Sequence, residues 1–236
     1  MIPGPLQSKL QLAFDAAVAE LSARAAASHC AERVTERSVV GAAGTSLPQN
    51  LSVVEAGNSG PYQLVRLRRA TLDDVRLLEL WSSSPHYMGE FNDFGLSPRP
   101  TAYESIEKNG LVGEHGGTLM VEQLPDSEPI GNVSWRLVRY NPNLEYFAWN
   151  IGISLIPEAR GRGFGTQAQR ILADHLLATT SVNRIEAATD IENLAEQRSL
   201  EKAGFIRDGV LRGAQYRAGA WHDLAIYSVV RKVGPG

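Results

Sequence analysis

The chain has 236 residues, with 23 Lys and Arg against 26 Asp and Glu, which gives a formal net charge of −3. Hydrophobic residues make up 43% and charged residues 21%, so the composition suits a folded domain and excludes a wholly disordered chain, a collagen-like repeat or a coiled coil. The near-neutral balance argues against a dedicated nucleic-acid binder. The lone Cys30 excludes an intrachain disulfide and a cysteine-based zinc cluster.

The sequence also lacks the usual marks of export and membrane insertion. The N-terminal stretch has no uninterrupted apolar core, because Gln11, Asp15 and Glu20 break it, so we do not expect a signal peptide. No window approaches the roughly 18 consecutive apolar residues that a membrane-spanning helix needs. We therefore expect a soluble cytoplasmic protein with no membrane partner.

The first 60 residues differ in texture from the rest. An alanine-rich stretch over residues 6–28 has apolar residues at helical spacing, which predicts a helix. The apolar stripe consists of Leu6, Leu10, Phe14, Val18 and Leu21. It requires a partner surface, either the main domain or a second subunit, so a homodimer through this helix is one expectation. Residues 38–60 are rich in Gly, Ser and Asn, which predicts a linker between this arm (residues 1–60) and a main domain (residues 61–236).

From Tyr62 onward, strand and helix patterns follow one another. A strand is expected up to residue 69, and a capping box of Thr71 and Asp74 opens a helix to residue 81. Residues 82–100 carry too many Pro, Gly and Ser for a regular element. The remaining expected elements are a helix at 102–109, strands at 117–124, 129–140 and 146–157, a helix at 166–180, a strand at 182–190, a helix at 193–204 and a hairpin at 204–232.

The candidate chemistry lies at residues 150–172, which predict a strand, an Arg/Gly loop and a helix. The loop glycines are Gly161, Gly163 and Gly165. Glycine allows a positive φ or a close approach of the backbone to a ligand. The N–H groups and the dipole at the helix start attract an anion, and Arg160 and Arg162 add charge suited to phosphate oxygens. These features predict a pyrophosphate cradle and leave open which phosphorylated cofactor occupies it.

Other interpretations of the loop compete with this one. A Walker A loop needs a lysine after its last glycine, but Thr166 follows Gly165 directly. Gly163, Gly165 and Ala168 satisfy a Gly-x-Gly-x-x-Ala dinucleotide pattern, but Pro-Glu-Ala-Arg separates the loop from its strand, and too little sequence follows for a doubly wound sheet. The remaining alternative is a loop that binds no ligand, in which the glycines only form a turn and the arginines are solvated.

The ordered set of motifs resembles the GNAT acetyltransferase superfamily. Arg160-x-x-Gly163-x-Gly165 is similar to the acetyl-CoA motif of that superfamily. The strand, the Asn-led helix, Lys-x-Gly-Phe and the final hairpin then follow as in the branch that contains ribosomal-protein N-terminal acetyltransferases. The resemblance covers residues 62–232 and implies an α/β (α+β) GNAT fold. That fold has flanking helices and a mixed, strongly twisted sheet of about six to seven strands, whose two central parallel strands splay apart.

The resemblance also implies acetyl-CoA as the acyl-donor substrate, with no metal. It places the pantetheine arm in the gap between the splayed strands, beside Ile153, Ser154 and Leu155. The cradle for the pyrophosphate then comprises Arg160, Gly161, Arg162, Gly163, Phe164, Gly165 and Thr166. Asn193 matches the asparagine that opens the helix beside the coenzyme.

The implied reaction is direct transfer of an acetyl group from a thioester to an amine, driven mostly by positioning. Two positions depart from many relatives. The glutamate before Ile-Gly is replaced by Asn150, which cannot act as a base but can hold a water or an amine. The serine three residues after the helix asparagine is replaced by Glu196. Ser199, one turn later, can take the place of that serine, and a solvated helix serine is the other interpretation.

We therefore look for the base in the irregular segment that follows residue 85. Glu90 is the preferred candidate, because neighbouring aromatic residues can hold its carboxylate in a partly apolar site. An exposed loop glutamate is the other interpretation, and His86, Tyr87 and Asp93 are weaker candidates. The acidic and aromatic residues of this segment suit a compact cationic amine.

The remaining histidines predict no metal site and no catalytic pair. His222 and Asp223 are neighbours on the last strand, where alternation sends them to opposite faces, so they do not form a dyad. No His-Glu-x-x-His occurs, and His29 and His115 have no metal-ligand spacing with any partner. His175 falls on the apolar face of its helix, which predicts a packed residue.

The sequence thus predicts an N-acetyltransferase that acts on the primary amine of a small molecule or a protein N-terminus. Two alternatives stay open. One is a transferase for a longer acyl group, and the other is an acyl-CoA-binding regulator without turnover, which the replaced glutamate and serine keep open.

Overall fold

The computed structural model describes residues 53–54, 63–92, 94, 102–140, 142 and 147–231. All of these residues belong to a compact unit, Thr45–Gly236. The helix expected at residues 6–28, most of the linker expected at 38–60, and Asp93 lie outside the described residues.

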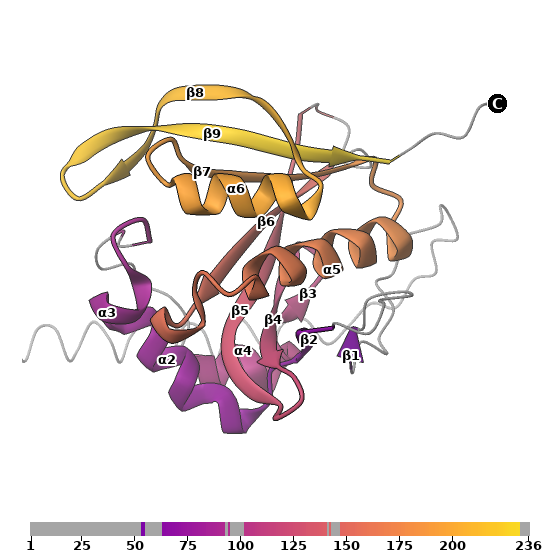
Figure 1. Ribbon diagram of the computed structural model, residues 1–236. Coiled ribbons are helices and arrows are strands. Elements are labelled where there is room, and N and C mark those ends of the chain that lie inside the picture. The colour runs from indigo at the N-terminus through magenta and orange to yellow at the C-terminus, as the bar shows by residue number, and fades with distance from the viewer. Residues whose placement is uncertain are drawn as a thin grey trace, which may run out of the picture. The chain divides into compact units, whose positions relative to one another are not determined.

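The described strands form one sheet in the order β1-β2-β4-β5-β6-β7-β9-β8, with β3 paired to β4 (Figure 1). The strands are β1 (Val53–Val54), β2 (Val65–Arg69), β3 (Val112–Gly113), β4 (Gly116–Gln123), β5 (Glu128–Val138), β6 (Ala148–Leu155), β7 (Arg184–Asp190), β8 (Ile206–Arg217) and β9 (Ala220–Val230). Strands β6 and β7 pair in parallel, and the other described pairs are antiparallel. The sheet is therefore mixed, as expected.

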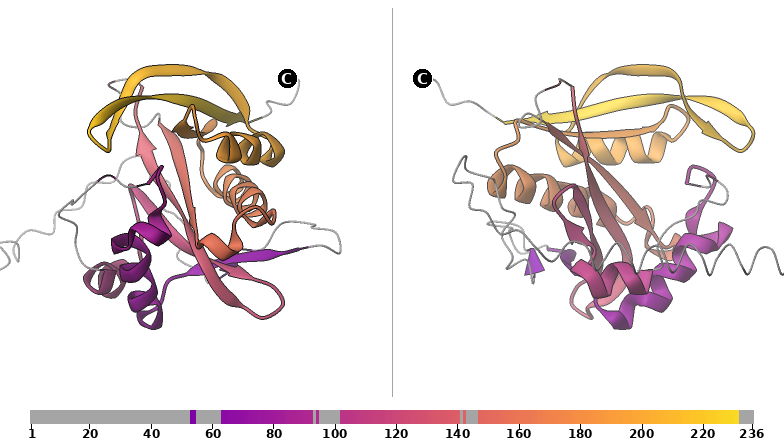
Figure 2. Two further views of the ribbon diagram at one scale, coloured as in Figure 1. Left: turned by 60° about the vertical axis from the view of Figure 1, so that its left-hand side comes forward. Right: turned by 180° about the vertical axis from the view of Figure 1, so that it is seen from behind.

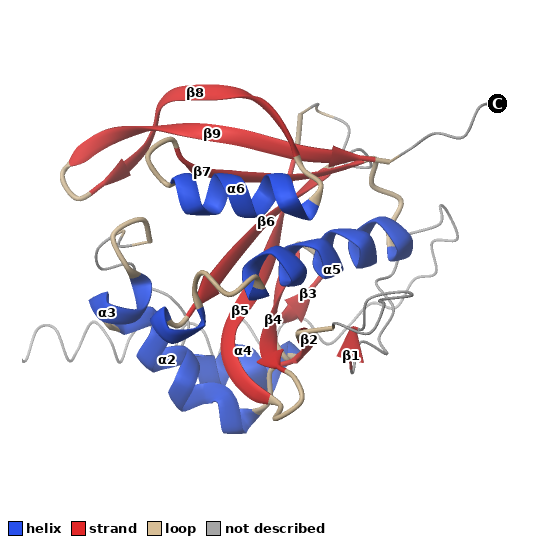
Figure 3. Ribbon diagram, viewed as in Figure 1, coloured by secondary structure: helices blue, strands red, loops and turns tan. Residues whose placement is uncertain are grey.

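Figure 3 distinguishes the helices from the strands; along the chain, one group of helical elements lies between β2 and β3, a second between β6 and β7, and a further helix lies between β7 and β8. They are η1 (Leu72–Asp74), α2 (Val75–Ser83), α3 (Pro85–Met88), α4 (Ala102–Asn109), η2 (Pro157–Ala159), α5 (Phe164–Thr179) and α6 (Leu194–Ala203). Among the described helices, none combines the length and apolarity needed to cross a lipid bilayer.

The expected order of long elements is confirmed, and four short elements, β1, β3, α3 and η2, were not predicted. The seven longer strands, β2 and β4 to β9, stand where alternation placed them. The two-residue strands β1 and β3 bring the sheet to nine strands, above the expected six to seven. The four-residue helix α3 lies inside the segment judged irregular, so that prediction was wrong at residues 85–88.

Alternation along the strands builds a hydrophobic core on each face of the sheet. On β4, Leu119 and Val121 join the larger core, which includes Leu172 of α5, whereas Met120 joins the smaller core with Leu78 of α2. Helices α5 and α6 accordingly lie on one side of the sheet, and α2 and α4 on the other (Figure 2).

The parallel strands β6 and β7 pair over only three positions, of which Ile151↔Ala187 is the last. Beyond it, β6 continues along β5 as far as Leu155, and β7 continues along β9 as far as Asp190. The two central strands therefore separate after Ile151, which confirms the expected splay.

Candidate active site

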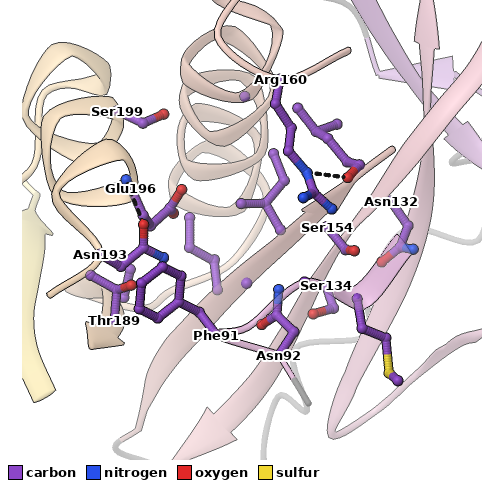
Figure 4. Close-up of a pocket in the computed structure, with 18 of the residues that line it drawn as sticks. Phe91, Asn92, Asn132, Ser134, Ser154, Arg160, Thr189, Asn193, Glu196 and Ser199 are labelled. Atoms are coloured by element: carbon purple, nitrogen blue, oxygen red, sulfur yellow. Dashed lines mark hydrogen bonds between the residues drawn. The ribbon is translucent and has the colours of Figure 1, made fainter. Parts of the chain in front are cut away.

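An open cleft of about 2110 Å³ follows the separation of β6 and β7. Residues of α5 and α6 form one wall, and the remainder is lined mainly by strands β4 to β7, helix α2, the loop between β6 and α5 and the loop after α3. Figure 4 labels Asn193, Glu196 and Ser199 on the helical wall and Asn132, Ser134 and Ser154 on the strands.

The loop between β6 and α5 has the geometry expected of an anion cradle. Gly161 and Gly163 have φ of +72° and +86°, a left-handed backbone that favours glycine. Helix α5 starts at Phe164, and its first helical bond runs from the Gln167 N–H to the Gly163 carbonyl at 3.1 Å. The N–H groups at residues 164–166 therefore precede the helical ladder and are available to an anion, with the helix dipole behind them.

Three other cradle residues differ in what they can offer a ligand. Gly165 lines the cleft, and a Cβ atom there would make ordinary van der Waals contact with Leu155 Cδ1 at 3.5 Å and Ile153 Cδ1 at 3.6 Å, so packing does not require a glycine at this position. The Phe164 side chain is buried in the larger core, so only its backbone can reach a ligand. Arg162 is exposed, and its guanidinium carbon lies 4.8 Å from the centre of the Phe164 ring.

The Arg160 side chain does not stand free in the cradle. Its Nε donates to the Leu155 carbonyl at 2.9 Å, and its Nη2 donates to the Tyr87 carbonyl at 2.5 Å. The guanidinium therefore joins the end of β6 to α3. The expectation that the Arg160 side chain offers its charge to a phosphate therefore has to be revised. The backbone of Arg160 remains part of the cradle.

Strand β6 offers peptide groups to the gap. The Ile156 N–H donates to Ile130 on β5 at 3.0 Å, and successive peptide groups of a strand point to opposite sides. The N–H groups of Ile153 and Leu155 consequently point toward the gap, as expected for an extended ligand that pairs like a strand. The peptide N–H of Ser154 faces β5, so this residue lines the cleft through its side chain.

For the coenzyme A that the sequence resemblance implies, this alternation predicts weaker binding to Ile153→Pro, with the fold retained. Proline removes an N–H that makes no bond to β5, so the sheet keeps its ladder, but a ligand in the gap loses a donor and meets the ring. We expect at least about a tenfold weaker Kd by calorimetry. Gly152→Pro is the matched control, because its N–H faces β5, and it should lower Tm far more. Equal Tm losses in the two variants would contradict the assigned directions.

The α6 wall carries a hydrogen-bonded polar chain. Asn193 caps the helix as expected, with its Oδ1 accepting from the Glu196 N–H at 3.2 Å. Ser199 Oγ donates to Gln169 Oε1 at 3.0 Å and lies 3.1 Å from Thr166 Oγ1. Ser199 is therefore a half-buried residue of the cleft, not the solvated helix serine of the other interpretation.

Glu196 is a second polar group in the same wall. Burial raises the pKa of its carboxyl, and the hydrogen bond that Gln169 donates to it opposes that rise only in part. A carboxyl that keeps its proton to higher pH can donate that proton within the cleft.

A row of polar side chains on the sheet completes the cleft and was missed from the sequence. Thr118, Asn132 and Ser134 line it from β4 and β5. A smaller adjoining cavity of about 390 Å³ contains Asn150, whose Oδ1 accepts from Arg136 Nε at 3.3 Å. The alternation of polar and apolar residues along β5 was the signal that could have revealed this row.

The loop after α3 also contributes residues to the lining of the cleft. Glu90 lines the cleft but is exposed, which matches the second interpretation of this residue rather than a partly apolar site. Tyr87 packs against the smaller core, and His86 is exposed, with its Nε2 3.9 Å from Glu158. The structure thus brings Glu90 to the same cleft as the cradle, and Asn150 to the adjoining cavity.

His222 and Asp223 make separate contacts, so the expectation that they form no dyad holds. Asp223 accepts from the Gly213 N–H at 2.7 Å, whereas His222 lies against Asp190 and Arg217. Within the described residues, no group of three or more His, Cys, Asp and Glu side chains is arranged to hold a metal ion.

A glycine cradle at a helix start, beside parallel strands that separate, is an arrangement suited to an extended ligand with an anionic end. The sequence matches the acetyltransferase (GNAT) domain family over residues 65–206. Because this match covers more than half of the chain, the chain belongs to the GNAT acetyltransferase family.

Named relatives and solved structures agree with this assignment. The chain is 34% identical over 80 residues to the probable N-acetyltransferase YjcK of Bacillus subtilis, a match that covers 34% of this chain and 44% of that protein. The fold is similar to Mycobacterium smegmatis RimJ in complex with a CoA-disulfide (TM-score 0.63, 21% identity, 78% of this chain and 90% of that one). It is also similar to a Vibrio cholerae spermidine N-acetyltransferase in complex with CoA and spermine (TM-score 0.59, 18% identity, 71% and 95%).

Proposed function

We propose that this protein is an N-acetyltransferase that moves an acetyl group from acetyl-CoA to a primary amine of a small molecule or a protein N-terminus. The observation that carries the proposal is the joining of three features in one cleft. These are the anion cradle, the open peptide edge of β6 and the polar face of β4 to β6. We further propose that both substrates are bound together, so that transfer is direct.

The residues present fit coenzyme A. The backbone of residues 161–166 would hold the pyrophosphate, since two glycines with positive φ and the start of α5 turn N–H groups toward one place. The peptide groups of Ile153 and Leu155 would pair with the amide-bearing pantetheine arm. Bound in this way, the coenzyme supplies an acetyl thioester at the polar face of the sheet.

Beyond positioning the two substrates, the protein has only to move protons during the transfer. The amine nitrogen bonds to the acetyl carbon, the carbon–sulfur bond breaks, the amine loses a proton and the sulfur gains one. We assign Glu90 as the acceptor of the amine proton, directly or through water, and Asn150 as a group that holds the amine or that water. Ser199, with Glu196 beside it on α6, is assigned as the proton source for sulfur.

One assay tests the proposal. Pure full-length protein is incubated with acetyl-CoA and a panel of polyamines, antibiotics and short peptides with free N-termini, while thiol release and product mass are followed. We expect acetylation of at least one amine. Tight coenzyme binding without turnover on any amine would favour a binding protein, and absence of coenzyme binding would overturn the proposal.

A further inference from the structure

Three polar side chains meet where β7, β8 and β9 come together: Arg217, Asp190 and His222, here called the Arg217 cluster. Arg217 donates to the Asp190 carboxylate, and these two side chains are only 5% and 2% exposed. His222 Nδ1 lies 3.2 Å from Arg217 Nη2 and 3.2 Å from Asp190 Oδ2. Removing such an ion pair from water is costly, and apolar replacements of buried pairs are often no less stable. Stability alone therefore does not account for the cluster.

Arg217 also reaches the loop that follows α3, 127 residues away in sequence. Its Nη1 donates to the Glu90 carbonyl, and its guanidinium carbon lies 5.2 Å from the centre of the Phe91 ring, a cation–π distance. Glu90 and Phe91 line the cleft, whereas Arg217 is not among the lining residues. The guanidinium thus fixes the loop from behind, outside the space that a substrate would fill.

Asp190 carries the contact onward to the helical wall. Its Oδ1 accepts from the Glu192 N–H at 2.8 Å, and its carbonyl accepts from the Asn193 N–H at 3.0 Å. Asn193 is the cap of α6. A continuous chain of contacts therefore runs from the loop through Arg217 and Asp190 to the start of α6.

We propose that Arg217 is a positioning residue that holds residues 89–92 at the acceptor end of the cleft and so determines which amines are accepted. The inference rests on the proposed transferase function and deepens it. A guanidinium is needed because its fork donates to a carboxylate and a carbonyl at once while its face stacks on a ring. A lysine ammonium is a point charge and cannot do all three.

The test compares Arg217→Lys with wild type. We expect KM to rise at least about tenfold for an accepted amine, and the ratio of kcat/KM for a polyamine and a short peptide to change severalfold. The Kd for coenzyme A, measured by calorimetry, should stay within about twofold, because the cradle is untouched. A variant with unchanged amine selectivity, or with coenzyme affinity lost in parallel, would overturn the proposal.

Arg184→Lys is the matched control. Arg184, on β7, pairs with Asp208 on β8 at 2.6 Å and with Glu186 on its own strand at 3.1 Å, but it makes no described contact with the loop. It should leave amine selectivity unchanged. Phe91→Leu is a second loop variant that spares the buried ion pair, in case Arg217→Lys folds poorly.

Hydrogen exchange separates failure of this inference from failure of the proposed function. If wild type acetylates no amine, the transferase function falls, and the loop contact is judged on the exchange of the amides at residues 89–92. Faster exchange there in Arg217→Lys and in Phe91→Leu than in Arg184→Lys supports the positioning role. Equal exchange in all three variants overturns it.

Discussion

Replacing Gly163 by glutamate is expected to weaken coenzyme A binding at least about a hundredfold, which corresponds to roughly 2.7 kcal/mol. Gly163 precedes the first residue of α5 and has φ of +86°. Its ideal Cβ would meet only Leu64 Cδ1, at 4.0 Å, so a glutamate side chain has room to enter the cleft. The carboxylate would then compete with the pyrophosphate for the N–H groups of the helix start. Calorimetric titration with coenzyme A measures the loss.

Two alanine variants separate this charge effect from backbone strain. Gly163→Ala and Gly204→Ala both force a side chain into a left-handed conformation, which costs on the order of 1–2 kcal/mol of stability. Gly204 ends α6 with φ of +100°, and no atom lies within 4 Å of its ideal Cβ. We expect similar Tm losses in both variants and an unchanged Kd in Gly204→Ala. Wild-type affinity in Gly163→Glu would remove the anion cradle from the proposal.

The start of α5 shows why short sequence motifs could predict a large part of the candidate site. The positive φ of Gly161 and Gly163, the start of α5 and the cap at Asn193 each depend on residues close together in sequence. Turn and cap preferences act over that range, so the sequence predicted the glycine turn and the helix opened by Asn193, and it placed the start of α5 two residues late, at 166 rather than 164. The burial of the Phe164 side chain depends on distant core residues, and the sequence motif did not reveal it.

The contacts that sequence reasoning missed join residues far apart in the chain. Arg217 meets Asp190, 27 positions earlier, and the loop at Glu90, 127 positions earlier. Alternation along β9 correctly placed His222 and Asp223 on opposite faces of the strand. It gave no information about which residues of other strands would contact His222. Strand pairing and loop position decide such contacts, and neither has a local signal.

The short elements could not be predicted from the sequence for a different reason. Strands β1 and β3 have two residues each, too few to display a period of two, and β1 lies in a stretch that composition assigned to a linker. Helix α3 begins at Pro85 after Ser84, and proline is favoured at a first helical position. The same residues that suggested an irregular segment therefore also permit one helical turn.

Asp74→Asn is expected to destabilise the protein by about 3 kcal/mol, or roughly 6–12 °C in Tm. The Asp74 carboxylate accepts from Arg68 at 2.6 and 2.9 Å and from the Thr71 N–H at 2.8 Å, which completes the capping box that the sequence predicted. Asp74 is buried, and Arg68 also pairs with buried Glu122. Arg66 pairs with Glu122 as well, at 2.6 Å, so an amide at position 74 would leave two guanidinium groups against one carboxylate. Asp73→Asn, at the exposed neighbouring position, is the control and should change stability by less than about 0.5 kcal/mol.

The pH dependence gives this prediction a second test. Burial alone would raise the pKa of Asp74, but the hydrogen bonds from Arg68 and Thr71 prevail and lower it. A carboxyl whose folded pKa is depressed stabilises the fold above its unfolded pKa of about 3.9 and loses that contribution as the pH falls through the folded value. The Tm gap between wild type and Asp74→Asn should therefore be full at neutral pH and shrink below about pH 4. A gap independent of pH would contradict the ionic origin of the effect.

Because η1 leads into α2, whose Leu78 and Trp81 line the cleft, the same variant should also raise KM for the amine.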